Sequence, residues 1–445
     1  MKKGLPILLS LVLLVGVSGV SGEEQPLVLT LDQSIDLALK QNPTLLAAGE
    51  RVRSAEYGIR EAVSGFFPAV TGQGLATLDE KLFSLEFPSM IPGQPPQTFE
   101  VDFTRDYQFA LSFIQPLYTG GKLLSGFRTA RYNLEATREG VRQSKHMLVF
   151  NTKRAFYGYL LAKEFVKVAA EAVEVAEKHH RTVKTQYEVG LASKFDLLRS
   201  EVQVANLKPQ LIRARNNQQV AELSFKTLLG LDLSRPVEIQ GELEYVPVDP
   251  DLEASLDNAV QNRPEINQLM IQQKMAGEML KMVRSEYLPS LALSATYNFW
   301  GDSFRFNNDP WQNYYAVNLV LSVPIFNGFA TASRIAKSRA ALRELEFSQK
   351  GIEDAVHFEV NQALLKLKEA RESLISQEKN VDQAKESLRI AELTFAEGLA
   401  TSLDVSSVQA ALSQAKTNHT QALFDYVLAK ADLDKAIGVG WKIDD

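Results

Sequence analysis

The 445-residue sequence contains no cysteine. Disulfide bonds, thiolate metal sites, a cysteine nucleophile and a lipid-modified N-terminal cysteine are therefore excluded. Without a cysteine we also expect no lipid anchor. Beyond residue 22 there is no run of about 18 apolar residues, so we expect no membrane-spanning helix. Lys and Arg are interleaved with Asp and Glu, and the formal net charge is −6, which argues against nucleic acid as a partner.

Motifs for catalysis and metal binding are also missing. The sequence has no His-Glu-x-x-His motif, no P-loop and no dinucleotide fingerprint. His179 and His180 are adjacent, and adjacent residues of a helix point apart, so we expect a core or lumen histidine at His180 rather than a metal ligand. We therefore expect no enzymatic activity, no cofactor and no metal.

The N-terminus has the pattern of a secretory signal peptide. Two lysines, Lys2 and Lys3, precede an apolar stretch from Leu5 to about Val17, and small residues follow up to a cleavage position before Glu23. Residues 1–22 are therefore predicted to be removed on export. The remaining composition, with 45% apolar and 23% charged residues over the whole chain, is that of folded protein.

An internal duplication organises the rest of the chain. The segment QPLYTGG from Gln115 recurs as VPIFNGF from Val323, and YEVGLAS from Tyr187 recurs as FAEGLAT from Phe395, both at an offset of 208 (323 − 115 and 395 − 187). Upstream, Asn-Pro at 42–43 and Phe-Pro at 67–68 match Arg-Pro at 263–264 and Leu-Pro at 288–289, both at an offset of 221 (263 − 42 and 288 − 67). The difference between the offsets (221 − 208 = 13) places one insertion in the first half, and the Pro-rich stretch 88–97 absorbs most of it as a surface loop. Two structurally equivalent halves are expected.

Each half contains two segments with a period of two, which predicts a β-hairpin. In the second half, Leu291, Leu293 and Ala295 alternate with small or polar residues, and the partner segment has Val317 and Leu319 on one side. Four strands of about ten residues match a tilted crossing of a bilayer. A sheet packed on a soluble core is the alternative, but aromatic residues collect near the strand ends and the second face is small and polar rather than charged, which favours membrane strands. The aromatic residues are Phe66, Phe67, Tyr118, Tyr287, Trp300, Trp311, Tyr314 and Phe326.

Helix-forming composition extends over residues 123–188 and 331–397, roughly 65 residues each, or about 100 Å at 1.5 Å per residue. Apolar residues spaced by three and four predict coiled-coil seams in both. The seam residues are Val166, Ala169, Val173, Ala176, His180, Val183 and Tyr187 in the first helix and Leu374, Val381, Ala384, Leu388, Ala391 and Phe395 in the second.

Shorter helices are predicted on both sides of each long helix. The entering helices cover about 32–66 and 252–287, and the returning helices cover 193–229 and 401–437. The combined length of an entering and a returning helix equals the length of the long helix. We therefore expect these two helices to stack end to end beside it. The predicted domains are the signal peptide 1–22, a first repeat 23–235 with hairpin 69–118, an equatorial linker 236–251 with a short strand, a second repeat 252–438 with hairpin 290–326, and a tail 439–445.

Four strands cannot close a barrel, and open strand edges are not tolerated in lipid, so the chain must oligomerise. Three copies give twelve strands, within the known range, whereas two give eight and leave no lumen. The predicted fold class is an α+β membrane protein: a homotrimeric 12-stranded β-barrel, four strands per chain, continuous with a long α-helical coiled-coil barrel.

These features together resemble the TolC-type outer-membrane efflux proteins. The resemblance rests on the segment LTLDQSIDLALKQNP from Leu29, on both Pro-bounded hairpins and on both Gly-Leu-Ala-Ser/Thr tips, and it covers essentially the whole mature chain. It implies a trimeric conduit through the outer membrane of a Gram-negative-type cell that extends into the periplasm. It also implies a periplasmic adaptor (membrane fusion protein), an inner-membrane pump of the RND, ABC or MFS class, and a role in multidrug efflux or type I secretion.

The two tips between the long and returning helices are the candidate functional site. Gly190 and Gly398 suit a left-handed position after the long helices. Ser193 and Thr401 are predicted helix N-caps, each followed three residues later by Asp196 or Asp404 in a capping-box arrangement. The resemblance adds a second role, in which Asp404 contributes to a cation-selective ring and Asp196 to a closing network. It also makes the tips the adaptor-docking surface, with contacts from Gly190, Leu191, Ser193, Gly398, Leu399 and Thr401.

The chain departs from the family pattern around the second tip. Where the best-studied members carry Tyr, Arg and a second Asp, this chain has Phe395, Ala400 and Ser407, so the usual gate bonds cannot form. Closure would then rest on packing of Tyr187, Phe395 and Leu399, or on a pair such as Lys194 with Asp404. The prolines that bound the hairpins are assigned to the junction of barrel and helices: Pro68, Pro116, Pro289 and Pro324.

Two other classes share some of these features. A trimeric coiled-coil surface adhesin or structural fibre would have the heptads and the signal peptide, but it should not place two hairpins in the middle of the chain. A passive nutrient porin would need many more strands. In an efflux or secretion system the pump, rather than the duct, is expected to select the exported substrate.

Overall fold

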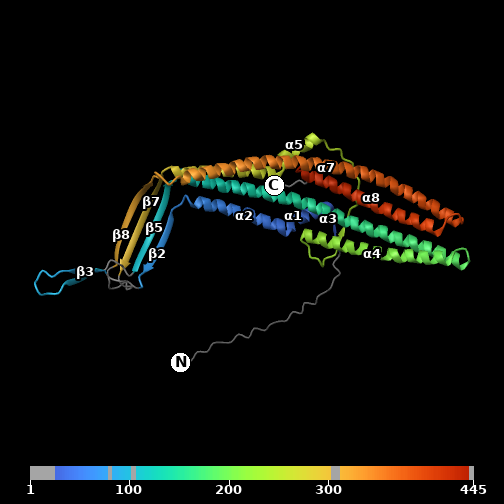
Figure 1. The fold of residues 1–445 in the computed structure, drawn as a ribbon, viewed down its shortest axis with the longest axis horizontal. Coiled ribbons are helices and arrows are strands. Elements are labelled where there is room, and N and C mark those ends of the chain that lie inside the picture. The colour runs from blue at the N-terminus through green and yellow to red at the C-terminus, as the bar shows by residue number, and fades with distance from the viewer. Residues whose placement is uncertain (1–25, 79–82, 102–106, 302–310, 440–445) are drawn as a thin grey trace, which may run out of the picture.

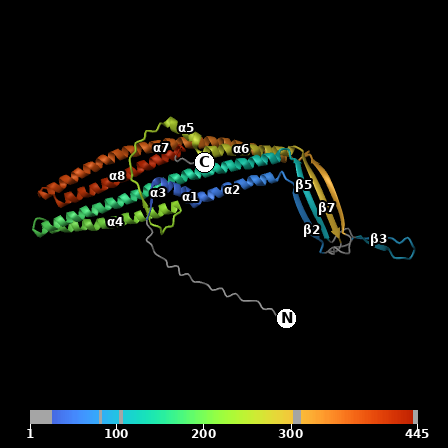
Figure 2. The same ribbon diagram turned by 180° about the vertical axis from the view of Figure 1, so that it is seen from behind.

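The computed structural model describes residues 26–78, 83–101, 107–301 and 311–439. The predicted signal peptide lies outside these residues, as does the tail beyond residue 439. Long helices run side by side along most of the molecule, and a β-sheet lies at one end of them (Figure 1). At the other end lie two turns, as Figure 2 shows from behind: one joins α3 (Lys122–Glu188) to α4 (Lys194–Leu229), and the other joins α7 (Ala330–Ala396) to α8 (Ser402–Ala436).

The sheet has four antiparallel strands in the order β2-β5-β7-β8. They are β2 (Ala69–Ala76), β5 (Tyr107–Tyr118), β7 (Ser290–Gly301) and β8 (Gln312–Ser322). The four predicted strands are thus confirmed. Strands β2 and β5 come from the first half of the chain and β7 and β8 from the second, so the two hairpins join side by side through β5 and β7.

The strand register reproduces the internal duplication. In the first hairpin Ala69 opposes Ile114, and in the second Ser290 opposes Ser322. Moving the first pair by the two sequence offsets (69 + 221 and 114 + 208) gives the second pair. The two hairpins therefore share one register, and the insertion lies between β2 and β5.

The insertion forms an extra two-stranded hairpin that the sequence did not predict. Strand β3 (Phe83–Phe87) pairs with β4 (Gln97–Val101), and the Pro-rich stretch predicted as a surface loop connects them. Each strand has five residues, which is too short for a clear period of two.

Two helices of 67 residues each dominate the molecule, and both begin and end within one residue of the predicted bounds. The complete set is α1 (Leu31–Gln41), α2 (Pro43–Ser64), α3 (Lys122–Glu188), α4 (Lys194–Leu229), α5 (Leu252–Asn262), α6 (Pro264–Arg284), the 3-10 turn η1 (Ser285–Tyr287), α7 (Ala330–Ala396) and α8 (Ser402–Ala436). None of the helices in the described part of the chain is both long and apolar enough to cross a membrane.

The prediction of two continuous entering helices is wrong. The first is broken between α1 and α2 at Asn42, and the second between α5 and α6 at Arg263; both residues are extended and precede a proline. A residue before proline is disfavoured in helical geometry, and proline is well suited to the first position of the next helix. The Asn42 side chain also caps α2 by accepting hydrogen bonds from the backbone N–H groups of Thr44 and Leu45.

The returning helices end against these breaks, as the end-to-end prediction requires. The Asn42 side-chain amide donates to the Leu228 carbonyl at 2.9 Å, which ties the start of α2 to the end of α4. In the second half, a Cβ placed on Gly438, after α8, would lie 3.1 Å from the Asn262 carbonyl carbon. Each long helix is thus flanked by a short helix pair that meets near its middle.

The hydrophobic core is concentrated where the short helices meet, near the middle of the long helices; we call this region the mid-height joint. Strand β6 (Val237–Ile239) from the linker pairs in parallel with β1 (Leu27–Leu29), and both pack on Phe156 and Phe225. In the equivalent cluster of the second half, Val356 and Leu433 take the places of Leu148 and Phe225, at the same offset as the tips (356 − 148 and 433 − 225). The short strand predicted in the linker is confirmed at mid-height.

Candidate channel wall and tip gate

The sheet presents two chemically different faces. Directly opposed residues on neighbouring strands point to the same face of the sheet. The strand register therefore identifies which residues of all four strands share a face. One face is mainly apolar and includes Val70, Phe109, Leu111, Phe113, Leu291, Leu293, Ala295, Tyr297, Phe299, Tyr315, Val317, Leu319 and Leu321. The opposite face is mainly small or polar and includes Thr71, Gln73, Gln108, Ala110, Ser112, Ala292, Ser294, Thr296, Asn298, Ala316, Asn318 and Ser322. An apolar outside and a polar inside are the two faces of a membrane β-barrel wall.

Aromatic side chains gather at both ends of this wall. At the end far from the helices, Phe299 packs against Trp311 at 5.8 Å between ring centroids on the apolar face, whereas Trp300 packs edge-on against Tyr314 at 5.6 Å on the polar face. At the helical end, Phe67 and Phe326 are exposed, as is Tyr118. Two aromatic belts are typical of strands that cross a bilayer.

The four junction prolines lie near the helical end of the strands. Pro68 and Pro289 directly precede β2 and β7, and Pro324 follows β8 by two residues. Pro116 instead lies inside β5, where the pairing with β7 shifts between Pro116 and Tyr118. Proline has no N–H to donate to the ladder, so the pairing is irregular at this point.

Both tips are built by the same two motifs. After α3, Gly190 is left-handed with φ 82°, its N–H donates to the Tyr187 carbonyl, and the Leu191 N–H donates to the Gln186 carbonyl. After α7, Gly398 with φ 75° and Leu399 make the equivalent bonds to Phe395 and Thr394. These are Schellman motifs, in which only glycine avoids the steric cost of a left-handed residue.

The capping boxes predicted for the returning helices are also present. Ser193 Oγ donates to Asp196 Oδ2 at 2.5 Å, and the Asp196 N–H donates back to Ser193 Oγ at 3.1 Å. Thr401 Oγ1 donates to Asp404 Oδ2 at 2.6 Å, and the Thr401 N–H donates to the same oxygen at 2.8 Å. Hydrogen bonds from the Thr401 hydroxyl and backbone N–H lower the pKa of Asp404, so this carboxylate is charged at neutral pH.

The other gate candidates are distributed over the tips. Leu191 and Leu399 are 80% and 78% exposed, Tyr187 is 39% exposed, and Phe395 packs on the His179 ring at 5.3 Å between centroids. Within one chain, the described residues include no ion pair between Lys194 and Asp404. The exposed leucines form an apolar edge at the end of each hairpin, as an interface would.

The histidine pair contacts two neighbouring helices. His180, predicted at a seam position, faces α4, and His179, for which the sequence made no prediction, is the more deeply buried ring at 7% exposed. The two imidazoles bind serines on two different helices: His179 Nε2 lies 2.9 Å from Ser402 Oγ on α8, and His180 Nδ1 lies 2.8 Å from Ser200 Oγ on α4. The described residues contain no cluster of three or more His, Asp or Glu side chains that could hold a metal.

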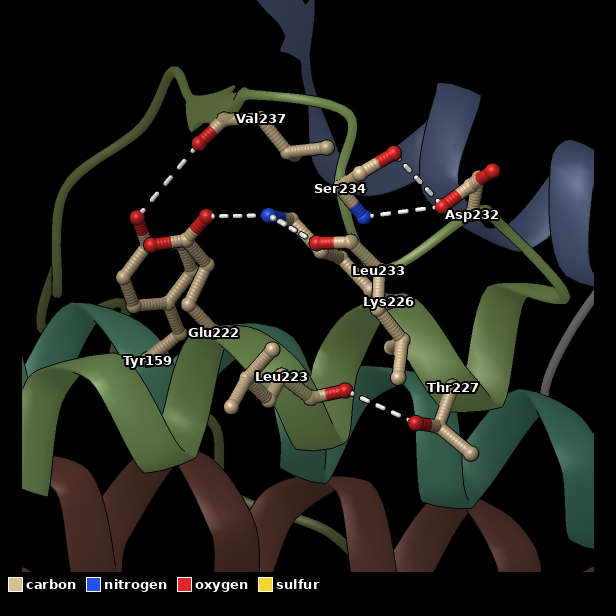
Figure 3. A network of polar contacts seen from close by, with 9 residues as sticks. All are labelled: Tyr159, Glu222, Leu223, Lys226, Thr227, Asp232, Leu233, Ser234 and Val237. Carbon is tan, nitrogen blue, oxygen red and sulfur yellow. Dashed lines mark hydrogen bonds and ion pairs between the residues drawn. The ribbon is translucent and has the colours of Figure 1, made fainter.

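The mid-height joint also contains a network of polar contacts that the sequence did not predict. Lys226 on α4 is 4% exposed, and its ammonium pairs with Glu222 at 2.5 Å and donates to the Leu233 carbonyl at 3.4 Å (Figure 3). The Tyr159 hydroxyl from α3 donates to the Val237 carbonyl at 3.5 Å. Burial, and then the charge of Glu222, raises the pKa of Tyr159 to about 12. This network joins α3, α4 and the linker strand. Side chains from distant segments combine here, so no local motif could have predicted it.

Similarity to known proteins agrees with this architecture. The family described as "Outer membrane efflux protein" matches residues 34–231 and 255–439. Alkaline protease secretion protein AprF of Pseudomonas aeruginosa is 25% identical over 352 residues, which cover 76% of this chain and 72% of that protein. Probable efflux pump outer membrane protein TtgC of Pseudomonas putida is 24% identical over 424 residues, which cover 92% and 83%.

Solved structures share the fold. The outer-membrane channel OprN superimposes with a TM-score of 0.75 at 16% identity and covers 92% of this chain and 90% of that one. The outer membrane protein VceC from Vibrio cholerae superimposes with a TM-score of 0.73 at 18% identity, covering 93% and 97%. Since the family match extends over most of the sequence and the fold is shared, the chain belongs to the outer membrane efflux protein family, whose members are transport ducts rather than enzymes.

Proposed function

We propose that three copies of this chain close into a twelve-stranded barrel continuous with a helical tube, and that this trimer is the exit duct of a tripartite export system. The chain is an outer-membrane exit channel for efflux or type I secretion, and such channels work with a periplasmic adaptor and an inner-membrane pump. The trimer, the docking surface and the gate are the proposed elements. A surface fibre lacks support, because the four-stranded sheet and the family match both indicate a channel.

The two unpaired edges of the sheet carry this proposal. Strands β2 and β8 each pair on one side only. In a bilayer, unpaired backbone N–H and C=O groups cost several kcal/mol each, so the edges must meet other strands. Strands β2 and β8 form the two opposite edges of the sheet, and their lengths differ by three residues, 8 against 11. Strand β8 of one copy can therefore pair with β2 of the next along most of its length.

The internal duplication predicts the register of this proposed contact. Strand β5 pairs with β7 inside the chain, with Leu111 opposite Tyr297. Applying the two sequence offsets to this pair gives Leu319 (111 + 208) and Ala76 (297 − 221). We therefore expect Leu319 of one copy to oppose Ala76 of the partner subunit.

Disulfide cross-linking tests this register, because the chain has no native cysteine. The double variant Leu319→Cys/Ala76→Cys should form covalent dimers and trimers on mild oxidation in outer-membrane fractions. The matched control, Leu319→Cys/Gly72→Cys, places the second thiol on the same face of β2 but about 14 Å along the strand, beyond the reach of a disulfide. Cross-linking of the control alone, or of neither variant in correctly inserted protein, would contradict the proposed trimer.

The tips are the proposed entrance and docking surface. Leu191 and Leu399 are the main proposed docking contacts, because they are the most exposed apolar side chains of the tips. The turns that hold them at the surface are formed by Gly190, Ser193, Gly398 and Thr401. The proposed gate consists of Asp404, Asp196, Tyr187, Phe395 and Lys194. Asp404 would place one negative charge per copy at the entrance, which favours cations. The pump, of the RND, ABC or MFS class, would select the cargo.

A further inference from the structure

Close to the tips, two adjacent histidines of α3 form hydrogen bonds to two different neighbouring helices. His179 reaches Ser402 at the start of α8, and His180 reaches Ser200 on α4. The first bond joins the α3–α4 hairpin to the α7–α8 hairpin, whereas the second lies within the α3–α4 hairpin. His179 is therefore a polar link between the two hairpins whose ends form the tips.

This link is buried and its surroundings carry no counter-charge. Ser402 is 3% exposed and Ser200 is 1% exposed, and the Phe395 ring of α7 covers the His179 ring. Ser200 Oγ donates its own hydrogen to the Leu197 carbonyl, so it must accept from His180 Nδ1. His180 is thus fixed as an Nδ1–H tautomer in its neutral form.

The ionisable groups around His179 do not favour a charged ring. Burial is the main cause that lowers the pKa of His179, and the charge of neighbouring His180 lowers it further; the hydrogen bond to Ser402 raises it in part, but the net shift is downward. Helix α8 presents the hydroxyl of Ser402 and α7 presents the Phe395 ring, and neither is charged. The carboxylates at the starts of α8 and α4, Asp404 and Asp196, are engaged by their own caps Thr401 and Ser193. A proton on His179 is therefore accommodated better when the ring meets water.

We propose that His179 is an acid-sensitive latch, which holds the α7–α8 hairpin against the α3–α4 hairpin when neutral and releases it when protonated. This inference rests on the proposed gate at the tips, and adds to it a control by the pH of the periplasm. The latch occurs once per chain, because the duplicated positions of His179 and His180 are Ser387 and Leu388 (179 + 208 and 180 + 208). In the proposed trimer, the equivalent seam between copies would therefore have no imidazole at this position.

The direction of the effect follows from the two states. With the hairpins together the pKa of His179 lies below its ordinary value of 6.5, and with the hairpins apart the ring is hydrated and its pKa returns toward 6.5. Acidification through this range therefore favours separation. A difference of one pKa unit between the states would change the ratio of closed to open tips by about tenfold.

A fluorescent label at the tip tests the latch without relying on conductance. Leu399→Cys supplies the only thiol, and an environment-sensitive fluorophore attached to it in the full-length trimer reports separation of the α7–α8 hairpin as pH falls from about 8 to about 5. We expect an emission shift in this parent with a midpoint below 6.5, and no shift in the same protein carrying His179→Gln, which can still bond Ser402 but cannot titrate. The matched His180→Gln variant should retain the shift.

A second variant keeps the test decisive if His179→Gln does not assemble. Ser402→Ala removes the bond and leaves the imidazole, so the closed state is weaker and the midpoint should move to higher pH. An unchanged midpoint, or an equal shift in His179→Gln and parent, would overturn the latch. Conductance recorded in parallel separates the two proposals: a pH-dependent label without pH-dependent conductance would support the latch and contradict the gate at the tips.

Discussion

Gly230, at the end of α4, lies against the carbonyl oxygen of Gln41, at the end of α1: a Cβ placed on Gly230 would lie 2.8 Å from that oxygen. The glycine is also left-handed, with φ 71°. Two helix ends from distant parts of the sequence therefore meet at a point where no side chain fits. The duplicated position after α8, Gly438, is left-handed too and approaches Asn262.

Gly230→Ala is expected to destabilise the protein more than Gly190→Ala. Both substitutions place alanine in a left-handed conformation, at about 1 kcal/mol. Gly190 has no atom within 4 Å of its Cβ position, so strain is the whole cost there, whereas Gly230 must also displace the backbone of Gln41. The midpoint of thermal unfolding in detergent measures the difference, and equal midpoints for the two variants would show that the mid-height joint is not tightly packed.

Removing the partner of the buried lysine should be more costly than removing an exposed charge. Glu222→Gln leaves the Lys226 ammonium buried without its counter-ion, which destabilises by about 3 kcal/mol. The double variant Glu222→Met/Lys226→Met removes both charges and should recover most of the loss. As a control, Glu50→Gln breaks an ion pair with Arg53 in which both side chains are about two-thirds exposed, and should cost less than about 1 kcal/mol. If Glu222→Gln behaves like this control, water reaches Lys226.

Tyr159 should make the protein sensitive to alkaline conditions. Its pKa is about 12 in the folded chain and 10.0 in the unfolded chain, so the unfolded state loses the proton first. The contribution of Tyr159 to stability is therefore constant below pH 10.0 and falls as the pH rises from there to about 12. Tyr159→Phe removes this group, and its unfolding midpoint should change less over that interval. An identical alkaline profile for Tyr159→Phe would assign the effect to other tyrosines or lysines.

The sequence predicts well where a long periodic pattern is repeated. The strands and the two long helices extend over many residues with one period, and the duplication supplies each pattern twice, so their bounds were accurate. The tips were also predictable, since glycine after a helix and Ser or Thr three residues before Asp are local signals with a stereochemical cause. Of the predicted seam residues, Val173, Ala176, Val183, Leu374 and Val381 are buried within one chain.

Features that depend on distant contacts were missed. The break at Asn42 was predictable from Pro43, but its meeting with Leu228 and Gly230 was not. His180 faces α4 through Ser200, in line with its seam position, but the burial of His179 was missed, because the α3–α8 contact that buries it is set by tertiary packing rather than by the period of one helix. The Lys226 network also required three segments to be brought together, so helical periodicity could show only that Lys226 interrupts an apolar stretch.

Single-channel recording in planar bilayers tests the exit-duct account most directly. Asp404 is charged at neutral pH because its pKa is lowered, so the trimer should show a small cation-selective conductance that multivalent cations block. Asp404→Ala should lose selectivity and block, whereas Ser407→Ala, one turn further along α8, should keep both. No conductance from correctly inserted trimers, or a selectivity that Asp404→Ala leaves unchanged, would contradict a gated duct with Asp404 at its entrance.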